Sequence, residues 1–215
     1  MRITPFRGTE LAVQKTHDWL DGHARQPVVV LASGGSSAPI LATAWQLLRP
    51  DRQANITFSL ADERYGEPGH ENSNWTLLQR CGMDVSASRH QPVLQSDVSM
   101  EDATARWGNW LHQKLYGQTP VIAFLGIGDD SHIAGLKPHC PALHDLGVAA
   151  CYDWSDFRRI TITPSGLLHV SSTVVYAHGS AKKDAIALLD SEQDFDSYPS
   201  QLLKQIPDCT VYYQQ

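Results

Sequence analysis

The best candidate for acid–base chemistry is a polar segment that directly follows an apolar run of the chain. Asp130 and His132 lie two residues apart, just after the glycines Gly126 and Gly128. A carboxylate can hold one imidazole nitrogen and so leave the other nitrogen free to act as a base. Histidine suits base catalysis at neutral pH because its unperturbed pKa lies near ~6.5. The segment therefore predicts a general base, although a loop histidine that only bonds the backbone fits the same residues.

A glycine-rich turn is the best candidate for anion binding. It consists of Ser33-Gly34-Gly35-Ser36-Ser37, between an apolar run and a helical pattern. Glycine lets the backbone approach a ligand closely, and the N–H groups at the start of a helix attract phosphate. The turn therefore predicts phosphate contacts from its glycines and from its last two serines. The alternative is a tight turn in which a serine only caps the helix.

Charged residues at two further places fit a phosphorylated ligand with several hydroxyl groups. Asp62, Glu63 and Arg64 are consecutive, and they could orient sugar hydroxyls and a carboxylate or phosphate group. Arg159 and Lys182 could hold one phosphate together, the arginine through two parallel hydrogen bonds and the lysine as a point charge. The alternative for both places is a solvated salt bridge or a pair of exposed charges, which contributes little.

The elements expected to position these residues alternate between strands and helices. Several strands are apolar on both faces, which is typical of an α/β domain with a largely parallel sheet flanked by helices. Right-handed crossovers then bring the polar clusters to one edge of the sheet, beyond the carboxyl ends of its strands. We expect strands at 27–33, 56–62, 121–128, 159–163, 172–178 and 210–213, helices at 9–24, 38–48, 74–80, 100–116 and 181–189, and a loop at 63–72.

Composition limits the class of protein and of partner. The 215 residues favour a single domain over 1–215, and a net charge of −6 without a long basic run argues against nucleic-acid binding. No apolar run approaches the length of a membrane span, so no membrane contact is expected. The four scattered cysteines and the lack of an apolar leader predict a cytoplasmic protein. His139, Cys140 and His144 cluster but match no standard zinc spacing, so no metal is expected.

The order and spacing of these motifs resemble the 6-phosphogluconolactonase family and its relatives, the glucosamine-6-phosphate deaminases. Family members carry SGGSTP, DER followed after eight residues by SN, GxGxDGHxASLFP, RITLT and a GxxK lysine. This chain carries SGGSSAP, DER followed after eight residues by Ser73-Asn74, GIGDDSHIAGLKP, RITIT and GSAK. The match covers nearly the whole chain, and the order of the motifs is more specific than any one of them.

The resemblance implies an α/β fold of the phosphosugar-isomerase and CoA-transferase type. It also implies a phosphorylated sugar lactone as substrate, no cofactor, and a monomer by default. We expect His132 to be the base, Asp130 to orient it, and Arg64 or backbone N–H groups to stabilise the oxyanion. The expected substrate contacts come from Gly34, Gly35, Ser36, Ser37, Asp62, Glu63, Asn74, Arg159 and Lys182.

Two departures separate this chain from the deaminases. Those enzymes have DEY where this chain has DER, and a glutamate of their ring-opening machinery aligns with Lys137. We therefore expect lactone hydrolysis, with a deaminase or isomerase and a non-catalytic phosphosugar-binding protein as the alternatives. Within the lactonase motif, Gly135 and Lys137 replace the usual serine and phenylalanine. Ser131 replaces a glycine, and a positive φ at that position would strain a serine.

Overall fold

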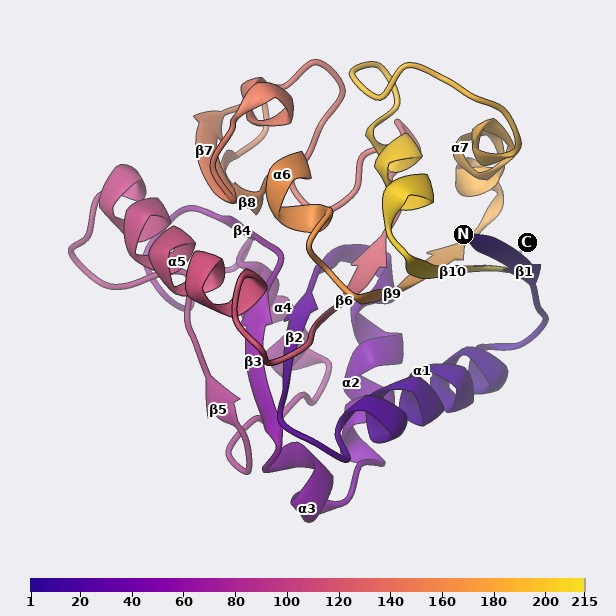
Figure 1. Ribbon diagram of the computed structural model, residues 1–215, viewed down its shortest axis with the longest axis horizontal. Helices are drawn as coiled ribbons and strands as arrows, with labels where there is room; N and C mark the ends of the chain where they lie inside the picture. The colour runs from indigo at the N-terminus through magenta and orange to yellow at the C-terminus, as the bar shows by residue number, and fades with distance from the viewer. Residues whose placement is uncertain (215) are drawn as a thin grey trace.

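A seven-stranded sheet forms the centre of the computed structural model, which describes residues 1–214 (Figure 1). Every pair of neighbouring strands in this sheet is parallel, which confirms the predicted fold class. Across the sheet the order is β1 (Arg2–Pro5), β10 (Asp208–Gln214), β9 (Ser172–His178), β6 (Val121–Gly126), β2 (Val28–Ala32), β3 (Ile56–Leu60) and β5 (Arg89–His90).

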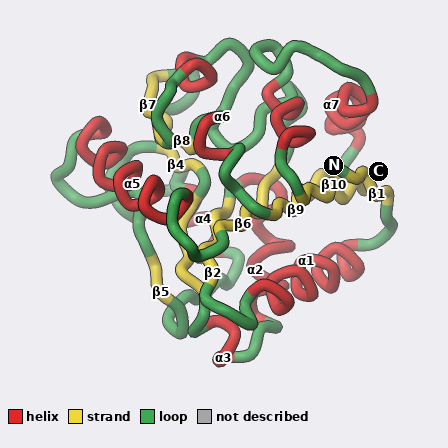
Figure 2. Tube along the Cα trace, viewed as in Figure 1, coloured by secondary structure: helices red, strands yellow, loops and turns green. Residues whose placement is uncertain are grey.

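The apolar runs of the sequence become the central strands because helices cover both faces of the sheet. All residues of β2 are buried, and so are the first five of β6. α1 (Thr9–His23) and α2 (Ala38–Gln46) pack on one face, while α6 (Pro164–Leu167) and α7 (Lys183–Ala187) lie on the other (Figures 1 and 2). The fully buried Trp45 of α2 meets the ring of Phe58 on β3 edge-on, which ties helix and sheet together.

A second sheet stands beside the first and corrects two expectations. It is antiparallel, with the order β4 (Asp62–Arg64), β8 (Arg158–Ile162) and β7 (Ala149–Asp153), and α5 (Met100–Leu115) packs against β7 and β8. The strand expected at 159–163 therefore does not extend the parallel sheet. Residues 63 and 64 were expected in a loop but belong to β4. Three polar residues are too few to show an alternating pattern, so the sequence did not reveal this strand.

The remaining differences concern short or exposed elements. The strands β1, β5 and β7 were not expected, and β1 lies at an edge of the sheet where most of its residues are exposed. The helix expected at 181–189 is divided into the 3-10 turns Ser180–Lys182 and Leu188–Asp190 on either side of α7. The helices α3 (Pro50–Gln53) and α4 (Asn74–Arg80) complete the main elements.

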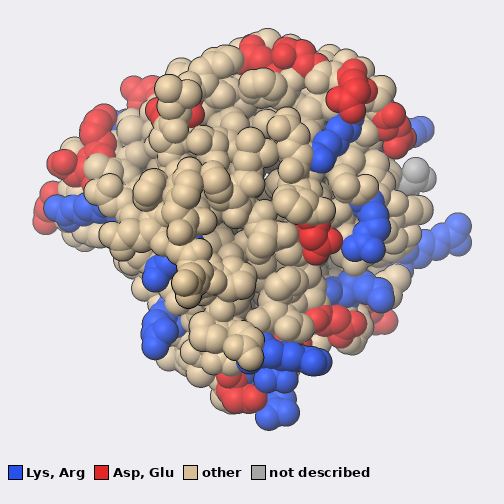
Figure 3. Space-filling model, in the orientation of Figure 1, with Lys and Arg blue, Asp and Glu red and all other residues tan. Residues whose placement is uncertain are grey.

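The outer surface offers no extended cationic area on the face drawn in Figure 3. Lys and Arg side chains lie scattered around the rim of that face, among Asp and Glu side chains. Such a distribution gives no support to a nucleic-acid surface there. Among the helices of residues 1–214, none combines the length and the apolar character that crossing a bilayer requires.

Candidate functional site

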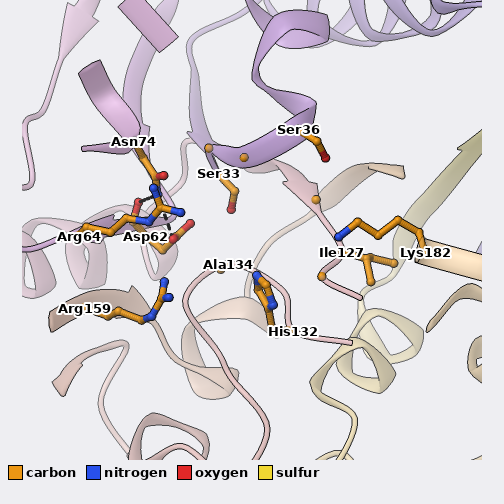
Figure 4. A pocket seen from close by; sticks show the side chains of 14 residues that line it. Ser33, Ser36, Asp62, Arg64, Asn74, Ile127, His132, Ala134, Arg159 and Lys182 are labelled. Atoms are coloured by element: carbon orange, nitrogen blue, oxygen red, sulfur yellow. Dashed lines mark hydrogen bonds between the residues drawn. The ribbon is translucent and has the colours of Figure 1, made fainter. Parts of the chain in front are cut away.

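A cavity opens at the carboxyl edge of the parallel sheet, where the antiparallel sheet adjoins it (Figure 4). Parallel neighbours bring the ends of β2, β3, β6 and β9 to the same edge. Nine of the twelve predicted site residues line the cavity, and Ser37, Glu63 and Asp130 do not. The lining residues are Ser33, Gly34, Gly35, Ser36, Asp62, Arg64, Asn74, Gly126, Ile127, Gly128, His132, Ala134, Arg159 and Lys182.

The turn after β2 needs its two glycines for different reasons. Gly35 has a φ of +76°, a left-handed conformation that residues with a Cβ rarely adopt. Gly34 has a negative φ, but a Cβ there would collide with the side chain of Asn74. Ser36 lines the cavity, whereas Ser37 is buried and its Oγ donates to Gly34 O at 3.2 Å. Ser37 therefore stabilises the turn and does not line the cavity, and its expected contact with the ligand stays a prediction.

The residues of β4 alternate between two sides, and one side faces the cavity. Asp62 and Arg64 lie on the cavity side, while Glu63 points the other way. The buried Glu63 carboxylate accepts hydrogen bonds from Ser73 Oγ at 2.8 Å, from Asn74 N–H at 2.6 Å and from two further backbone N–H groups. Burial raises the pKa of Glu63, and these hydrogen bonds oppose that shift. Glu63 thus holds the first turn of α4 and does not line this cavity, and its expected contact with substrate stays a prediction.

Two guanidinium groups meet on one side of the cavity because β4 pairs with β8. Arg64 is the cross-strand partner of Arg159, and both guanidinium carbons lie near the Phe157 ring, 5.3 and 5.6 Å from its centroid. Only 5% of the Arg159 side chain is exposed, and its Nη2 donates to Asp156 Oδ2 at 2.7 Å. Although burial alone raises the pKa of Asp156, the contact with Arg159 holds it below its ordinary value. The arrangement presents two fixed cations to a ligand.

The loop after β6 fixes the orientation of His132. Asp130 Oδ1 accepts hydrogen bonds from His132 Nδ1 at 2.5 Å and from the backbone N–H of the same residue at 3.2 Å. Gly128 N–H donates to His132 O at 2.8 Å, and a Cβ on Gly128 would collide with the His132 ring. A proton on Nδ1 satisfies the carboxylate, so Nε2 is the nitrogen left for chemistry. Asp130 lies behind His132 and can act only through it.

Ser131 adopts a positive φ, the condition under which a serine in place of the family's glycine is strained. Its φ is +66°, in a region where the Cβ of an L-residue is crowded. Two hydrogen bonds hold it there: within the loop Ser131 N–H donates to Gly128 O at 3.1 Å, and from far along the chain Ser200 N–H donates to Ser131 O at 2.9 Å. The loop that carries Asp130 and His132 is therefore held in place by the rest of the fold.

Lys182 reaches the cavity from the side opposite Arg159 (Figure 4). It lies on the 3-10 turn after β9, and its Nζ is 3.8 Å from Asp129 Oδ1. The sequence predicts Arg159 and Lys182 on successive strand–helix units. In the structure Arg159 lies on β8 of the antiparallel sheet, whereas Lys182 follows β9 of the parallel sheet. The two side chains share the cavity, yet the arrangement in Figure 4 does not support a close clamp formed by the two alone.

The cavity concentrates polar atoms that have no partner. Buried polar side-chain atoms are usually hydrogen-bonded, and exceptions ask for an explanation. Nine such atoms without a partner occur within residues 1–214, and five of them belong to residues that line this cavity. These five atoms are Ser33 Oγ, Asp62 Oδ1, Arg64 Nε, Asn74 Oδ1 and Arg159 Nε. Donors and acceptors that stand unpaired together fit a ligand that carries both hydroxyl groups and negative charge.

Sequence reasoning missed the residues that shape the arginine pair. Phe157 and Asp156 contact Arg159, but no motif marked them in the sequence. The one available signal is an aromatic residue two positions before an arginine at the start of a strand, which is weak.

The His139 and His144 side chains both bond to Asp196, at 2.6 and 2.9 Å. No group of three or more metal-ligating side chains is found in the described part of the chain.

Comparisons with known proteins agree with the geometry. A family model described as glucosamine-6-phosphate isomerases/6-phosphogluconolactonase matches residues 8–212. A 6-phosphogluconolactonase of Pseudomonas putida is 37% identical over 120 residues, which are 55% of this chain and 48% of that protein. The aligned stretch thus spans about half the length of the Pseudomonas relative. A 6-phosphogluconolactonase of Nostoc sp. is 28% identical over 187 residues, 82% of this chain and 77% of that protein.

Solved structures share this fold at low sequence identity. The crystal structure of a 6-phosphogluconolactonase from Shewanella baltica has a TM-score of 0.84 and 15% identity to this chain, with 100% of this chain and 98% of that chain covered. The motifs at the strand ends, the cavity that they form and the match over 8–212 lead to one conclusion. The chain belongs to the glucosamine-6-phosphate isomerase/6-phosphogluconolactonase family.

Proposed function

We propose that this chain hydrolyses 6-phospho-D-glucono-1,5-lactone to 6-phosphogluconate, a reaction of the oxidative pentose phosphate pathway. The observation that carries the proposal is the Asp130–His132 pair beside a cavity with two arginines and unpartnered acceptors. The family and the relatives named 6-phosphogluconolactonase support the same reaction. We further propose that the chain acts as a single-domain monomer in the cytoplasm, without a cofactor.

His132 is the general base of this mechanism. Its Nε2 takes a proton from water while the water oxygen attacks C1 of the lactone. Asp130 holds Nδ1–H and stabilises the charge that forms on the ring. The bond between C1 and the ring oxygen then breaks, and the imidazolium returns its proton to that leaving oxygen. The open-chain acid and a neutral imidazole result.

The antiparallel side of the cavity recognises charge and hydroxyl groups. Arg64 stabilises the oxyanion at C1, and its buried Nε has no partner within the protein. Asp62 Oδ1 and Asn74 Oδ1 accept hydrogen bonds from sugar hydroxyls. Arg159 and Lys182 remain the predicted phosphate ligands. The two cations enter the cavity from opposite sides, with His132 between them in the view of Figure 4.

The reaction requires only a moderate rate enhancement. δ-Lactones open fairly readily in water, so a base worth roughly 10²–10⁴-fold together with correct positioning suffices. Contacts to the remote phosphate fix C1 beside His132, which turns binding energy into orientation. No metal ion is needed to activate the water in this scheme.

A coupled assay with freshly made 6-phosphogluconolactone tests the proposal, with spontaneous hydrolysis subtracted. We expect turnover well above the spontaneous rate, lost in a His132→Ala variant that keeps its fold. Binding of 6-phosphogluconate without any turnover would indicate a non-catalytic phosphosugar-binding protein instead.

Lys137 favours the lactone over an amino sugar. Its Nζ forms an ion pair with Asp130 at 2.9 Å, in the place where the deaminases carry a glutamate. An ammonium cannot shuttle protons as a carboxylate does. We therefore expect no ammonia from glucosamine 6-phosphate. Robust ammonia release with little lactone hydrolysis would reverse the assignment.

A further inference from the structure

Lys137 contacts the Asp130–His132 pair without lining the cavity. Its Nζ donates to Asp130 Oδ2 at 2.9 Å, while Oδ1 of the same carboxylate faces His132 Nδ1. The same ammonium nitrogen lies 3.2 Å from His132 Nδ1. Only 16% of the Lys137 side chain is exposed, which is unusual for lysine. The phenylalanine of the family motif could make none of these polar contacts.

The backbone directs Lys137 towards its partners. Ala134 has a φ of +49°, and Leu136 N–H donates to Ile133 O at 2.9 Å, so the chain reverses just after His132. Cys140 N–H donates to Lys137 O at 3.1 Å, which fixes the backbone beyond the reversal. The ammonium thereby comes back to a carboxylate seven residues earlier in the chain. These backbone hydrogen bonds fix the loop that brings Lys137 to Asp130.

The charges of the three side chains are coupled. Burial alone raises the pKa of Asp130, but the hydrogen bond from His132 and the ion pair with Lys137 outweigh it and hold this pKa well below its usual range. His132 Nδ1 cannot both donate to Asp130 and accept from Lys137. The ammonium therefore interacts with the imidazole through charge, and it opposes a second proton on the ring.

We propose that Lys137 is a positioning residue for the hydrolysis proposed above: it fixes the Asp130 carboxylate against His132 and offsets its charge. Asp130 can then orient the ring without holding it as an imidazolium. The Nδ1–H that His132 donates to Asp130 leaves the lone pair of the neutral ring on Nε2. The kinetic consequence rests on the proposed function, whereas the protonation of His132 does not.

The other charged groups around His132 are common to the native protein and to the Lys137 variants. These groups line the same cavity or pair with a residue that does: Asp62 and Arg64 on β4, Arg159 on β8, Lys182 after β9, and Asp129 beside Lys182. Any change in the behaviour of His132 can therefore be assigned to Lys137 and its contacts with Asp130.

Kinetics of Lys137→Met and Lys137→Arg provide the first arm of the test. Methionine keeps the stem without the charge, and we expect kcat to fall about tenfold with KM changed less than about twofold. We expect the acid limb of the pH profile of kcat/KM to move to higher pH, since the imidazolium loses its nearby cation. Lys137→Arg keeps the charge and restores most of kcat. An unchanged kcat and pH profile, or a rise in KM alone, would overturn the proposal.

Side-chain ¹H–¹⁵N NMR of the histidines provides an arm that needs no activity. The His132 signals are assigned by comparison with His132→Gln. We expect a proton on Nδ1 in the native protein at neutral pH, and a second proton that binds at higher pH in Lys137→Met than in the native protein. Identical titrations of His132 in the two proteins would overturn the role of Lys137. If no lactone is hydrolysed while the titrations differ, the proposed function fails and the role of Lys137 stands.

Discussion

The two walls of the cavity differ in how their polar groups are paired. The parallel wall consists of the turn after β2, the loop after β6 and Lys182, and the antiparallel wall consists of Asp62, Arg64, Asn74 and Arg159. On the parallel wall, His132 is bonded to Asp130, and Lys182 lies near Asp129. On the antiparallel wall, each of the four residues leaves one buried polar atom unpaired.

This difference separates two tasks. Groups that are already bonded to one another are held in place before a ligand arrives, which suits acid–base chemistry. Groups without partners carry the free-energy cost of their burial until a ligand completes their hydrogen bonds, which suits recognition. Ser33 Oγ, unpaired on the parallel wall, is the exception. Substitution of His132 on the parallel wall should therefore lower turnover, and substitution of Asp62, Asn74 or Arg159 on the antiparallel wall should weaken binding. The proposed roles of Lys182, in phosphate binding, and of Arg64, at the oxyanion, cross this division.

Removal of His132 has the largest expected effect. His132→Ala should lower kcat by roughly 10²–10⁴-fold with little change in KM, because the base is lost while the antiparallel wall is intact. Steady-state kinetics, corrected for spontaneous hydrolysis, measure both constants. His112→Ala, an exposed histidine of α5, is the matched control and should behave like the native protein. A large rise in KM with kcat preserved would place His132 among the binding residues.

Arg159→Gln should mainly raise KM, by about 10–100-fold, because a charged hydrogen bond to the substrate is lost. The neighbouring Arg158 gives a matched control. Its half-exposed side chain lies over the Tyr65 ring and pairs with Asp153 at 3.0 Å, away from the cavity. Arg158→Gln should leave KM near the native value. Equal effects of the two substitutions would show that net charge matters and that the antiparallel wall does not recognise the substrate.

Glu63 sharpens the comparison because it lies on β4 between two cavity residues and yet faces away from it. Glu63→Ala should lower the free energy of unfolding by about 2–3 kcal/mol, since several buried donors at the start of α4 lose their acceptor. Urea unfolding measures this change, with the exposed Glu71→Ala as control. A rise in KM with unchanged stability would return Glu63 to the substrate contacts.

Substitution of Ser131 by glycine should have the smallest effect. Unlike Glu63→Ala, it should raise the free energy of unfolding. Ser131→Gly should raise the free energy of unfolding by about 0.5–1 kcal/mol, because glycine tolerates the φ of +66°. Ser131→Ala keeps the crowded Cβ and should give no such gain. Thermal or urea unfolding of the two variants compares them directly. An equal stability of the glycine and alanine variants would mean that the loop carries no strain at this position.

The sequence predicted the parallel wall better than the antiparallel wall, for a physical reason. Buried parallel strands such as 27–33 and 121–128 are long apolar runs, and the glycines that follow them mark the turns. Their polar ends could therefore be placed on one edge from topology alone. The position of Ser131 at a positive φ could be expected as well, because the family motif has glycine there.

The antiparallel wall could not be read in the same way. The strand β4 has three polar residues, so nothing in the sequence showed that Glu63 and Arg64 face opposite sides. The pairing of β4 with β8 joins residues about a hundred positions apart, and it places Arg64 opposite Arg159. Phe157 and Asp156 matter only once that pairing exists. The ion pair of Lys137 likewise depends on a chain reversal that the sequence did not reveal.

The binding of 6-phosphogluconate to inactive variants tests the division between the walls most directly. Isothermal titration calorimetry gives the Kd of the product without any need for turnover. We predict that His132→Ala binds within about threefold of the native protein, while Arg159→Gln binds more than about tenfold more weakly. A His132→Ala variant that loses its affinity together with its activity, beside an Arg159→Gln variant that keeps its affinity, would contradict the division.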